Sequence, residues 1–412
     1  MKNMKRFGSS WERRKFLLAV GLASTLGSLR PGNLYGAYLA GRHGESYRAL
    51  GVRPLINAAG TYTTLTGSVI PPEVREAMAE ASRYFVPLIE LQRAVGEQIT
   101  KMLGVEAALV SAGAASSITL ATAACVTRGD PGKVRRIPDT TGMKDEVIMP
   151  KSHRMGFDHA ARAVGVKIVE VETPEELEKA INEKTAMLFF VHIFEHRGKI
   201  NRNHFIAAGK RHNIPVFNDA AAELPPMTNL SAIVGEGFDM VCFSGGKGLR
   251  GPQASGLLIG RKDLIEWAHA NNNPHSDTIG RGMKVGKEEI MGLLKAVEIY
   301  HKRDHEYDQK QWRGFMKRVA KIVGDVPSIG TEVYVPGPGG HPIPYLRVKW
   351  DQRKLGLSYS ECYKALQDGE PRIEVNNTES GLELASYNLF PGEERIVGMR
   401  LREILLDAAR KA

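Results

Sequence analysis

Short apolar runs alternate with helix-like segments through residues 107–260. The runs are apolar almost throughout rather than at every second position, which is typical of strands buried on both faces. The segments between them are long enough to form helices that cross over a sheet and cover it. The sequence therefore predicts an α/β fold with a large, mainly parallel sheet. The predicted strands are Ala107–Val110, Val147–Met149, Lys167–Val171, Ala186–Val191, Pro215–Asn218, Met240–Phe243 and Ser255–Ile259.

Helices are predicted around these strands from apolar periodicity and from residues that start or stop helices. Segment 128–146 is instead rich in charge, proline and glycine, and we expect a loop there. The predicted helices are Glu73–Tyr84, Glu90–Leu103, Ala114–Val126, Gly156–Val164, Pro174–Asn182 and Asn203–His212.

Four polar residues each lie just past the end of a predicted strand: Ser111, His153, Asp219 and Lys247. Parallel strands end at the same edge of their sheet, and open α/β sheets bind their ligands at that edge. We therefore expect these four side chains to meet at one ligand-binding edge.

Lys247 follows the apolar run Met240–Phe243 and the tight sequence Ser244-Gly245-Gly246. A turn there would place a primary amine at the mouth of an apolar interior, where loss of water favours the neutral, nucleophilic amine. Such an amine suits a Schiff base with a carbonyl cofactor such as pyridoxal phosphate. An isolated lysine among glycines is more often a solvated loop residue. Asp219, at the end of another buried strand, favours the cofactor site.

A turn of small residues, Ser111–Ser117, joins a predicted strand to an apolar helix. Backbone N–H groups at the start of such a helix can bind a phosphate, and small side chains let the phosphate approach them. Many α/β proteins contain similar turns, so this motif gains weight from its neighbours Asp219 and Lys247.

The chain divides into four parts. Residues 1–40 form a basic leader, and residues 41–285 form the large sheet domain, which begins with an irregular segment rich in glycine and threonine. A long helix over Gly286–Val323 is expected to join two domains, so we assign 286–325 to a linking helix. Residues 326–412 then form a small α+β domain. Its expected elements are strands near Thr331–Val335 and Ile343–Lys349 and helices at Ser358–Gln367 and Glu393–Lys411.

The N-terminus resembles an export signal. A basic segment precedes a short, moderately apolar stretch over Phe16–Leu29. Residues 13–17 (R-R-K-F-L) are similar to the twin-arginine signal, which directs folded proteins across the bacterial inner membrane. We therefore expect a periplasmic or otherwise exported protein, and a cytoplasmic protein with an uncleaved basic helix is the alternative. The apolar stretch is too short and too rich in glycine for a stable membrane span.

The formal charge of the chain, +10, lies largely in that leader. Residues 1–40 hold seven lysines and arginines and one acid, a balance of +6 that leaves about +4 elsewhere. A balance of this size does not indicate nucleic-acid binding, whereas a modestly electropositive site for anionic substrates fits it. The three cysteines, Cys125, Cys242 and Cys362, are far apart, so we expect neither a disulfide framework nor a metal site.

Five short motifs of this chain occur together in one group of known proteins. They are Ile56–Thr61 (I-N-A-A-G-T), Ser111–Ala115 (S-A-G-A-A), Asp219–Pro225 (D-A-A-A-E-L-P), Ser244–Gln253 (S-G-G-K-G-L-R-G-P-Q) and Gly280–Glu289 (G-R-G-M-K-V-G-K-E-E). On these motifs the chain resembles, over residues 50–410, the selenocysteine synthase-like family, which includes L-seryl-tRNA(Sec) selenium transferase and D-glucosaminate-6-phosphate ammonia-lyase. The resemblance implies a pyridoxal-phosphate enzyme of the aspartate-aminotransferase fold (fold type I). It also implies a dimer or larger homo-oligomer whose subunits share active sites.

The resemblance implies roles for individual residues. Lys247 would form the Schiff base with pyridoxal phosphate and move the substrate's α-proton, and Asp219 would keep the cofactor's ring nitrogen protonated. His153 would lie against the cofactor ring or, alternatively, be a structural histidine. Glu223 would be a catalytic acid or base or, equally, a loop carboxylate. The cofactor's phosphate would be held by Gly113, Ala114, Ala115 and Ser244, with Ser111 as a further cofactor-binding residue.

A substrate carboxylate or phosphate needs a cation, and a planar guanidinium pairs with either in bidentate fashion. Arg281 is the first candidate for this role, and Arg93 and Arg400 are its competitors.

These features predict a lyase-type enzyme that acts on a small hydroxy- or sugar-amino acid by α,β-elimination and releases a keto acid and ammonia. Selenium transfer onto seryl-tRNA is the alternative, although no sizeable tRNA-binding domain precedes the Asn57 motif. Transamination, racemisation and aldol cleavage pass through the same carbanion. Because Asp219 and Lys247 are both present, we do not expect a non-enzymatic binding protein that has retained the cofactor fold. The expected partner is a small-molecule amino acid, and a nucleic acid is expected only under the alternative.

Overall fold

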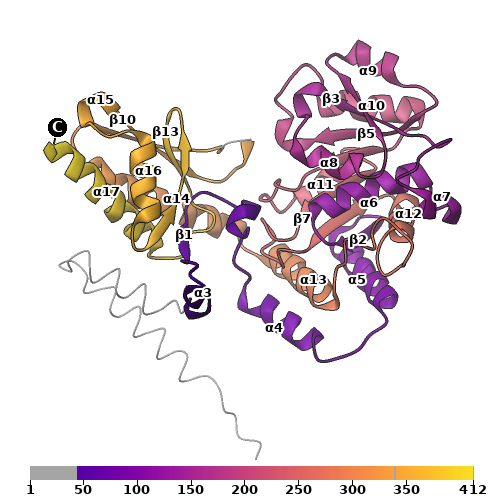
Figure 1. Cartoon of the computed structure of the whole chain (residues 1–412), viewed down its shortest axis with the longest axis horizontal. Helices are drawn as coiled ribbons and strands as arrows, with labels where there is room; N and C mark the ends of the chain where they lie inside the picture. The colour runs from indigo at the N-terminus through magenta and orange to yellow at the C-terminus, as the bar shows by residue number, and fades with distance from the viewer. Residues whose placement is uncertain (1–43, 338–339, 412) are drawn as a thin grey trace, which may run out of the picture.

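The computed structural model describes residues 44–337 and 340–411, which form two domains (Figure 1). The larger domain contains a seven-stranded sheet and the smaller one a four-stranded sheet. The predicted export signal lies outside the described residues. Within residues 44–337 and 340–411, no helix is long and apolar enough to cross a membrane.

The large sheet has the strand order β2-β8-β7-β6-β5-β3-β4. Neighbouring strands pair in parallel except at β8, which runs antiparallel between β2 and β7. The prediction of a large, mainly parallel sheet is therefore confirmed. The strands are β2 (Ala107–Ser111), β3 (Glu146–Pro150), β4 (Lys167–Val171), β5 (Thr185–Val191), β6 (Val216–Asp219), β7 (Met240–Ser244) and β8 (Gly256–Gly260).

Helices cover both faces of this sheet, as its apolar strands require. The apolar core on one face includes side chains of α5 (Leu88–Leu103), α9 (Pro174–Ala180), α10 (Arg202–His212), α11 (Asn229–Gly235) and α13 (Lys287–Lys302), and α4 (Pro72–Ala81) packs on α13. The core on the other face includes side chains of α6 (Ala114–Thr127), α8 (His159–Arg162) and α12 (Lys262–Asn271). Helix α6 is composed of small and apolar residues because it is buried between the sheet and α12.

The register of the large sheet brings the predicted site residues to one edge. Gly256 of β8 lies opposite both Ser111 of β2 and Ser244 of β7. Asp219, the last residue of β6, pairs with Cys242 of β7. The strand ends at Ser111, Asp219 and Ser244 therefore lie side by side at the carboxyl edge of the sheet.

The small domain is built on an antiparallel sheet of order β12-β13-β10-β9. Its apolar core includes Trp312, Phe315, Leu346 and Leu401, contributed by both the sheet and the helices. The strands are β9 (Ile329–Tyr334), β10 (Tyr345–Trp350), β12 (Asn376–Thr378) and β13 (Gly381–Ala385), and the helices are α14 (His305–Gly324), α15 (Gln352–Leu355), α16 (Tyr359–Asp368) and α17 (Glu393–Lys411).

The first described segment belongs with this small domain. Strand β1 (Leu55–Asn57) follows the short helix α3 (Glu45–Ala49) and pairs in parallel with β11 (Arg372–Glu374). Ile56 and Ala58 lie in the small-domain core. This differs from the expected division, which assigned residues 41–60 to the large domain. The pairing joins segments far apart in the chain, and no local pattern indicates it.

The prediction of a single linking helix over Gly286–Val323 is wrong. Helix α13 ends at Lys302 and α14 begins at His305, because Arg303 is extended and the Asp304 side chain accepts a hydrogen bond from the Tyr307 N–H at 2.9 Å. This capping contact starts a new helix. The core of the large domain contains α13, and that of the small domain contains α14, so the break marks the passage between domains.

Two smaller predictions also differ from the structure. The expected loop 128–146 contains helix α7 (Pro131–Arg136), which Asp130 caps by accepting the Lys133 N–H at 2.9 Å. The expected helix Gly156–Val164 is reduced to a 3₁₀ turn, Gly156–Asp158, and the single turn of α8. The other 3₁₀ turns are Thr63–Leu65, Lys151–His153 and His192–Phe194.

Candidate active site

A cavity of about 530 Å³ opens at the carboxyl edge of the large sheet. Strand ends, the start of α6 and the turn after β7 build its wall. The predicted site residues that line it are Gly113, Ala114, Ala115, Asp219, Glu223, Ser244 and Lys247. Residues from three separate stretches of the chain thus reach one cavity.

The turn that carries Lys247 is held by its own backbone. The Gly251 N–H donates to the Gly245 carbonyl at 2.7 Å, and the Gly245 N–H donates to the Ser255 carbonyl at 2.9 Å. A Cβ on Gly246 would lie 2.8 Å from the Cα of Gln253, so a larger residue would not fit there. Lys247 itself is half-buried. The glycines therefore fold the chain tightly enough to leave the lysine side chain in the cavity.

Contacts with the N-terminal segment and the small domain also hold this turn. The Ser68 hydroxyl donates to the Lys247 carbonyl at 3.0 Å. The Tyr387 hydroxyl, from the small domain, donates to the Gly248 carbonyl at 2.6 Å, and Arg250 donates to the Tyr387 carbonyl at 2.6 Å. The lysine thus lies where the two domains meet.

Asp219 lies at the end of β6 and is only 7% exposed. Its Oδ1 accepts hydrogen bonds from the Ala221 N–H at 3.0 Å and from the Cys242 thiol at 3.6 Å. Burial raises the pKa of this carboxyl, and the Ala221 N–H and the Lys247 charge act in the opposite direction. A protonated ring nitrogen placed against Asp219 would supply the close positive charge that a buried carboxylate needs.

The start of α6 fits a phosphate group. Gly113 has φ +132°, and a Cβ added there would have no atom within 4 Å, so the cavity reaches the backbone at this point. The first N–H groups of a helix lack partners within the helix and bind anions. The buried hydroxyl of Ser116, in the same first turn, also has no hydrogen-bond partner. Together with Lys247 and Asp219, this turn makes a site that fits pyridoxal phosphate.

Ser111 and His153 do not line the cavity. Ser111 has no exposed surface, and its hydroxyl is bonded within the turn, to the Gly113 carbonyl at 2.9 Å and to Ser117 Oγ at 2.7 Å. His153 is also fully buried, with its Nδ1 accepting the Val191 N–H at 3.3 Å and its ring edge-on to Phe190. Burial lowers the pKa of His153 to about 4. Both side chains are therefore buried against their neighbours, as the structural alternative for His153 expects.

Glu223 reaches the cavity four residues after Asp219 and is 8% exposed. Its Oε1 has no hydrogen-bond partner, and its Oε2 lies 4.0 Å from Nε2 of His192. Burial raises the pKa of Glu223 to about 7, and the nearby charge of Asp219 adds to this effect. At neutral pH this carboxyl can therefore either give or take a proton.

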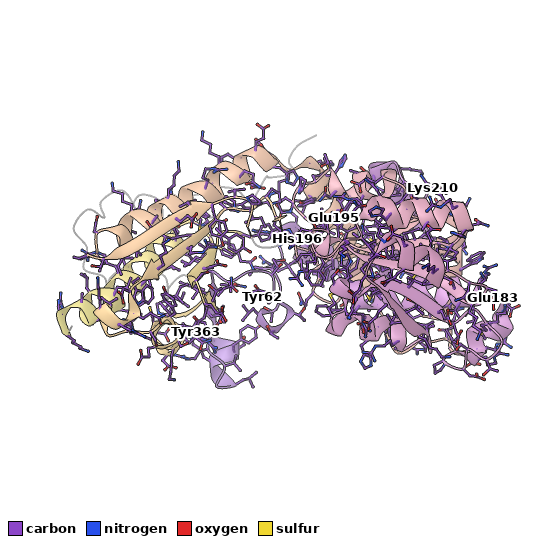
Figure 2. The ribbon with its side chains drawn as sticks, turned by 90° about the horizontal axis from the view of Figure 1, so that it is seen from above. Tyr62, Glu183, Glu195, His196, Lys210 and Tyr363 are labelled. Carbon is purple, nitrogen blue, oxygen red and sulfur yellow. The ribbon has the colours of Figure 1, made fainter. Side chains whose placement is uncertain are left out.

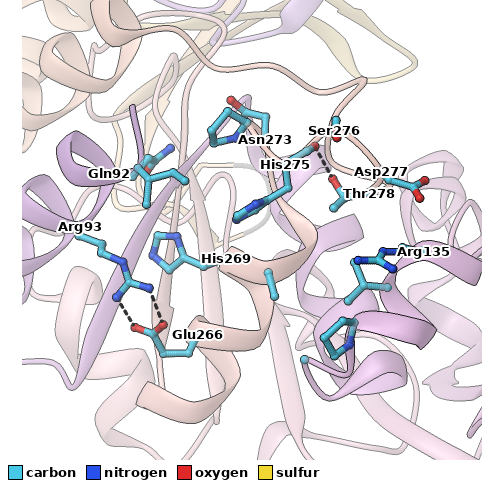
Figure 3. Close-up of a pocket in the computed structure, with 16 residues that line it drawn as sticks. Gln92, Arg93, Arg135, Glu266, His269, Asn273, His275, Ser276, Asp277 and Thr278 are labelled. Carbon is cyan, nitrogen blue, oxygen red and sulfur yellow. Dashed lines mark hydrogen bonds and ion pairs between the residues drawn. The ribbon is translucent and has the colours of Figure 1, made fainter. Parts of the chain in front are cut away.

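Arg93 and Arg281 do not reach the Lys247 cavity of their own chain. Arg93 lines a different pocket, of about 490 Å³, on the large domain and pairs there with Glu266 at 3.2 Å (Figure 3). Arg281 is exposed and lies in the loop that follows His275 and Thr278 of that pocket. Neither arginine lines the cavity that contains Lys247. Arg400, the third candidate, pairs with Glu403 at 2.7 Å.

Several residues of the site were not predicted from the sequence. Phe157, Phe194 and Gln253 line the Lys247 cavity. A second cavity, of about 400 Å³, shares Lys247 and lies between the domains, where it is lined by Arg197 and His341 among others. The segment around Phe194 and Arg197 directly follows strand β5, so the strand-end argument applied to Ala186–Val191 would have found it.

The remaining expectations concern metals and thiols. Among the residues that the structure describes, no group of three or more histidine, cysteine or acidic side chains is arranged to hold a metal ion. All three cysteines are unpaired and buried. Burial raises the thiol pKa of Cys362 to about 12 and shifts those of Cys125 and Cys242 in the same direction. These thiols are therefore protonated at neutral pH.

Comparison with known proteins gives a family match. The family model described as "SelA: L-seryl-tRNA selenium transferase" matches residues 55–313. D-glucosaminate-6-phosphate ammonia lyase of Salmonella typhimurium is 33% identical over 88% of this chain and 98% of its own length. 5'-C-glycyluridine monooxygenase-decarboxylase of a Streptomyces species is 31% identical over 89% and 94%. L-seryl-tRNA(Sec) selenium transferase of Aquifex aeolicus is 25% identical over 86% and 84%.

Solved structures agree with these sequence matches. The structure of a D-glucosaminate-6-phosphate ammonia-lyase superposes with a TM-score of 0.79 at 32% identity, covering 89% of this chain and 100% of that one. A serine palmitoyltransferase from S. paucimobilis superposes with a TM-score of 0.57 at 13% identity, covering 87% and 88%. The second match concerns the fold alone, which is that of fold-type-I pyridoxal-phosphate enzymes.

The raised pKa of Glu223 predicts a pH-dependent loss of stability. The folded protein holds the Glu223 proton more tightly than the unfolded chain does, so stability falls as the pH rises from about 4.5 to about 7. Replacing this carboxyl by an amide removes the cost of burying its charge, and Glu223→Gln should be more stable than the wild type by about 2–3 kcal/mol at pH 8.

Thermal denaturation of both proteins at about pH 4.5 and pH 8 measures this difference. The exposed carboxyl of Glu183 offers a matched control, since Glu183→Gln should change stability little at either pH. An advantage of Glu223→Gln that is equal at the two pH values would contradict the assignment.

Proposed function

The chain belongs to the L-seryl-tRNA selenium transferase family of pyridoxal-phosphate enzymes, and from this we propose that it is a lyase acting by α,β-elimination on a small hydroxy- or sugar-amino acid. The observation that carries the proposal is the meeting of Lys247, Asp219 and Glu223 at one cavity beside the start of α6. An amine, a buried carboxylate and a carboxyl with a pKa of about 7 are three different proton-handling groups.

The residues that would hold pyridoxal phosphate follow from the geometry of the cavity. The N–H groups that follow Gly113, together with Ser244, would bind the phosphate, Asp219 would face the ring nitrogen, and Lys247 would bind the carbonyl carbon. When bound, the cofactor supplies an electron sink for the negative charge that forms at the substrate's α-carbon.

The side chains of the chain then move the protons. Once the substrate's amine has replaced it at the cofactor, Nζ of Lys247 would be free to take the proton from the α-carbon, and the Asp219 carboxylate would keep the ring nitrogen protonated. As the bond from the β-carbon to the hydroxyl breaks, the Glu223 carboxyl gives its proton to the departing oxygen, which leaves as water. Glu223 suits this step because burial keeps it protonated up to about pH 7.

Selenium transfer onto seryl-tRNA is the second candidate, because the matching family model has that description. We rank it second because the relatives named for it share lower identity with this chain than the ammonia lyase does. The match to a monooxygenase-decarboxylase means that proteins similar to this chain differ in reaction, so the test must follow the products.

We also propose that the chain works as a homodimer or larger homo-oligomer. Tyr84, Phe85 and Val86 form an exposed apolar run in which the Phe85 side chain is fully exposed. Apolar runs of this kind are usually covered by a partner. Analytical ultracentrifugation of the holoprotein would give at least twice the chain mass, and a monomer would contradict the proposal.

Export through the twin-arginine pathway is a further proposal, and it rests on residues 13–17 of the sequence. Replacing both Arg13 and Arg14 by lysine should keep a reporter fusion in the cytoplasm, whereas replacing Lys2 and Lys5 by arginine should not. Export that survives the first replacement would refute the twin-arginine interpretation.

The elimination activity itself can be tested on the holoenzyme. Incubation with D-glucosaminate 6-phosphate and with D- and L-serine should release keto acid and ammonia in equal amounts from at least one of them. Lys247→Ala should lose at least about a thousandfold of that activity, because it removes the group that moves the α-proton. The exposed lysine on α10, Lys210→Ala, serves as the control and should keep full activity. Activity on seryl-tRNA alone would favour the second candidate.

A further inference from the structure

The cavity between the domains extends the site away from the sheet edge. It has a volume of about 400 Å³ and shares Lys247, Phe157 and Phe194 with the cavity that fits the cofactor. Because the two cavities share these residues, they adjoin beside the amine of Lys247. A substrate bound through its amine at Lys247 would therefore extend its remaining atoms into the interdomain cavity.

Positively charged and hydrogen-bonding groups line this cavity. Arg197 and His196 come from the segment after β5, and His341 comes from the small domain. Tyr62 and His196 lie at the junction of the two domains (Figure 2). Its described lining residues include no aspartate or glutamate. The electrostatic character of the cavity therefore favours an anion.

Among these three side chains, Arg197 is the one that is always positively charged. Its guanidinium lies 3.8 Å from the centroid of the Phe194 ring. Within residues 44–337 and 340–411, no carboxylate lies within ion-pair distance of it. Other arginines of this domain do have such partners, for example Arg202 with Glu236 at 2.7 Å and Arg154 with Asp158 at 2.6 Å. The stacked, unpaired guanidinium keeps its hydrogen-bond donors available to a ligand.

His341 lies on the opposite side of the cavity from the β5 segment, since it belongs to the small domain. Burial and the nearby charge of Lys247 lower its pKa, so it is a neutral imidazole that can donate or accept a hydrogen bond. A ligand held between Arg197 and His341 would contact both domains.

We propose that Arg197, with His196 and His341, forms a subsite in the interdomain cavity that binds an oxyanion of the substrate, a phosphate or a carboxylate, other than the group that reacts at Lys247. This rests on the proposed function, because it takes the reacting amine to be at Lys247. The substrate class is then an amino acid that has a second anionic group several bonds from its α-carbon. The ion pair with Arg197 selects for this group, and the tyrosine hydroxyls around the cavity are partners for hydroxyl groups between the two ends.

The test uses three six-carbon ligands without an amine, so none of them can enter the reaction. Glucitol 6-phosphate has only the phosphate, gluconate has only the carboxylate, and glucitol is neutral. Titration calorimetry of the holoenzyme measures the affinity of each. We expect at least one anionic ligand to bind at least tenfold more tightly than glucitol. Tighter binding of glucitol 6-phosphate would identify the oxyanion as a phosphate, and tighter binding of gluconate would identify it as a carboxylate.

The variant Arg197→Gln should weaken the preferred anionic ligand by about 10- to 100-fold, the loss expected for one charge-assisted pair, and leave glucitol unchanged. Lys199→Gln is the matched control, because Lys199 is an exposed cation on the same segment that does not line the cavity. It should change affinity less than twofold. If Arg197→Gln does not fold, His341→Gln tests the subsite from the other domain, with a smaller loss expected.

Two results would overturn the subsite. One is that neither anionic ligand binds more tightly than glucitol at millimolar concentration. The other is that the preference persists unchanged in Arg197→Gln and His341→Gln. Because binding is measured without turnover, anion binding in a protein that releases no keto acid would refute the proposed elimination and keep the subsite. Release of keto acid without any preference for the anionic ligands would refute the subsite and keep the proposed elimination.

Discussion

Parallel pairing of β6 with β7 is the constraint on which the rest of the site depends. It places Asp219 opposite Cys242, so the buried carboxylate and the turn that carries Lys247 leave the sheet at the same edge. The antiparallel strand β8 adds the third part, since Gly256 joins the end of β7 to the end of β2 and hence to the start of α6. The turn at the start of α6, a carboxylate and an amine therefore meet without any of them being adjacent in sequence.

Burial then decides what these groups do. Asp219 and Glu223 are both raised in pKa by loss of water, but they differ in their partners: Asp219 accepts two hydrogen bonds, and Glu223 leaves one oxygen without any. The first is suited to hold a positive charge and the second to carry a proton. A second cavity, which lies between the domains, shares Lys247 with the first and is lined by Arg197.

The fold class and most of the site follow from the sequence, because strand ends of a parallel sheet share one edge; Asp219 and Lys247 were located in this way. That argument places a residue but not the direction of its side chain, and the His153 side chain is in fact buried and does not line the cavity. The break at Asp304 was missed because apolar periodicity continues on both sides of a capping residue. The pairing of β1 with β11 has no local signal at all.

The central claim is that Lys247 is the amine that binds pyridoxal phosphate, and borohydride reduction tests it most directly. Purified holoprotein should be yellow, lose its visible absorption on reduction, and yield a single peptide in which a pyridoxyl group is attached to Lys247. A pyridoxyl group on another lysine, or a protein that binds no pyridoxal phosphate and gains no visible band when it is added, would contradict the account.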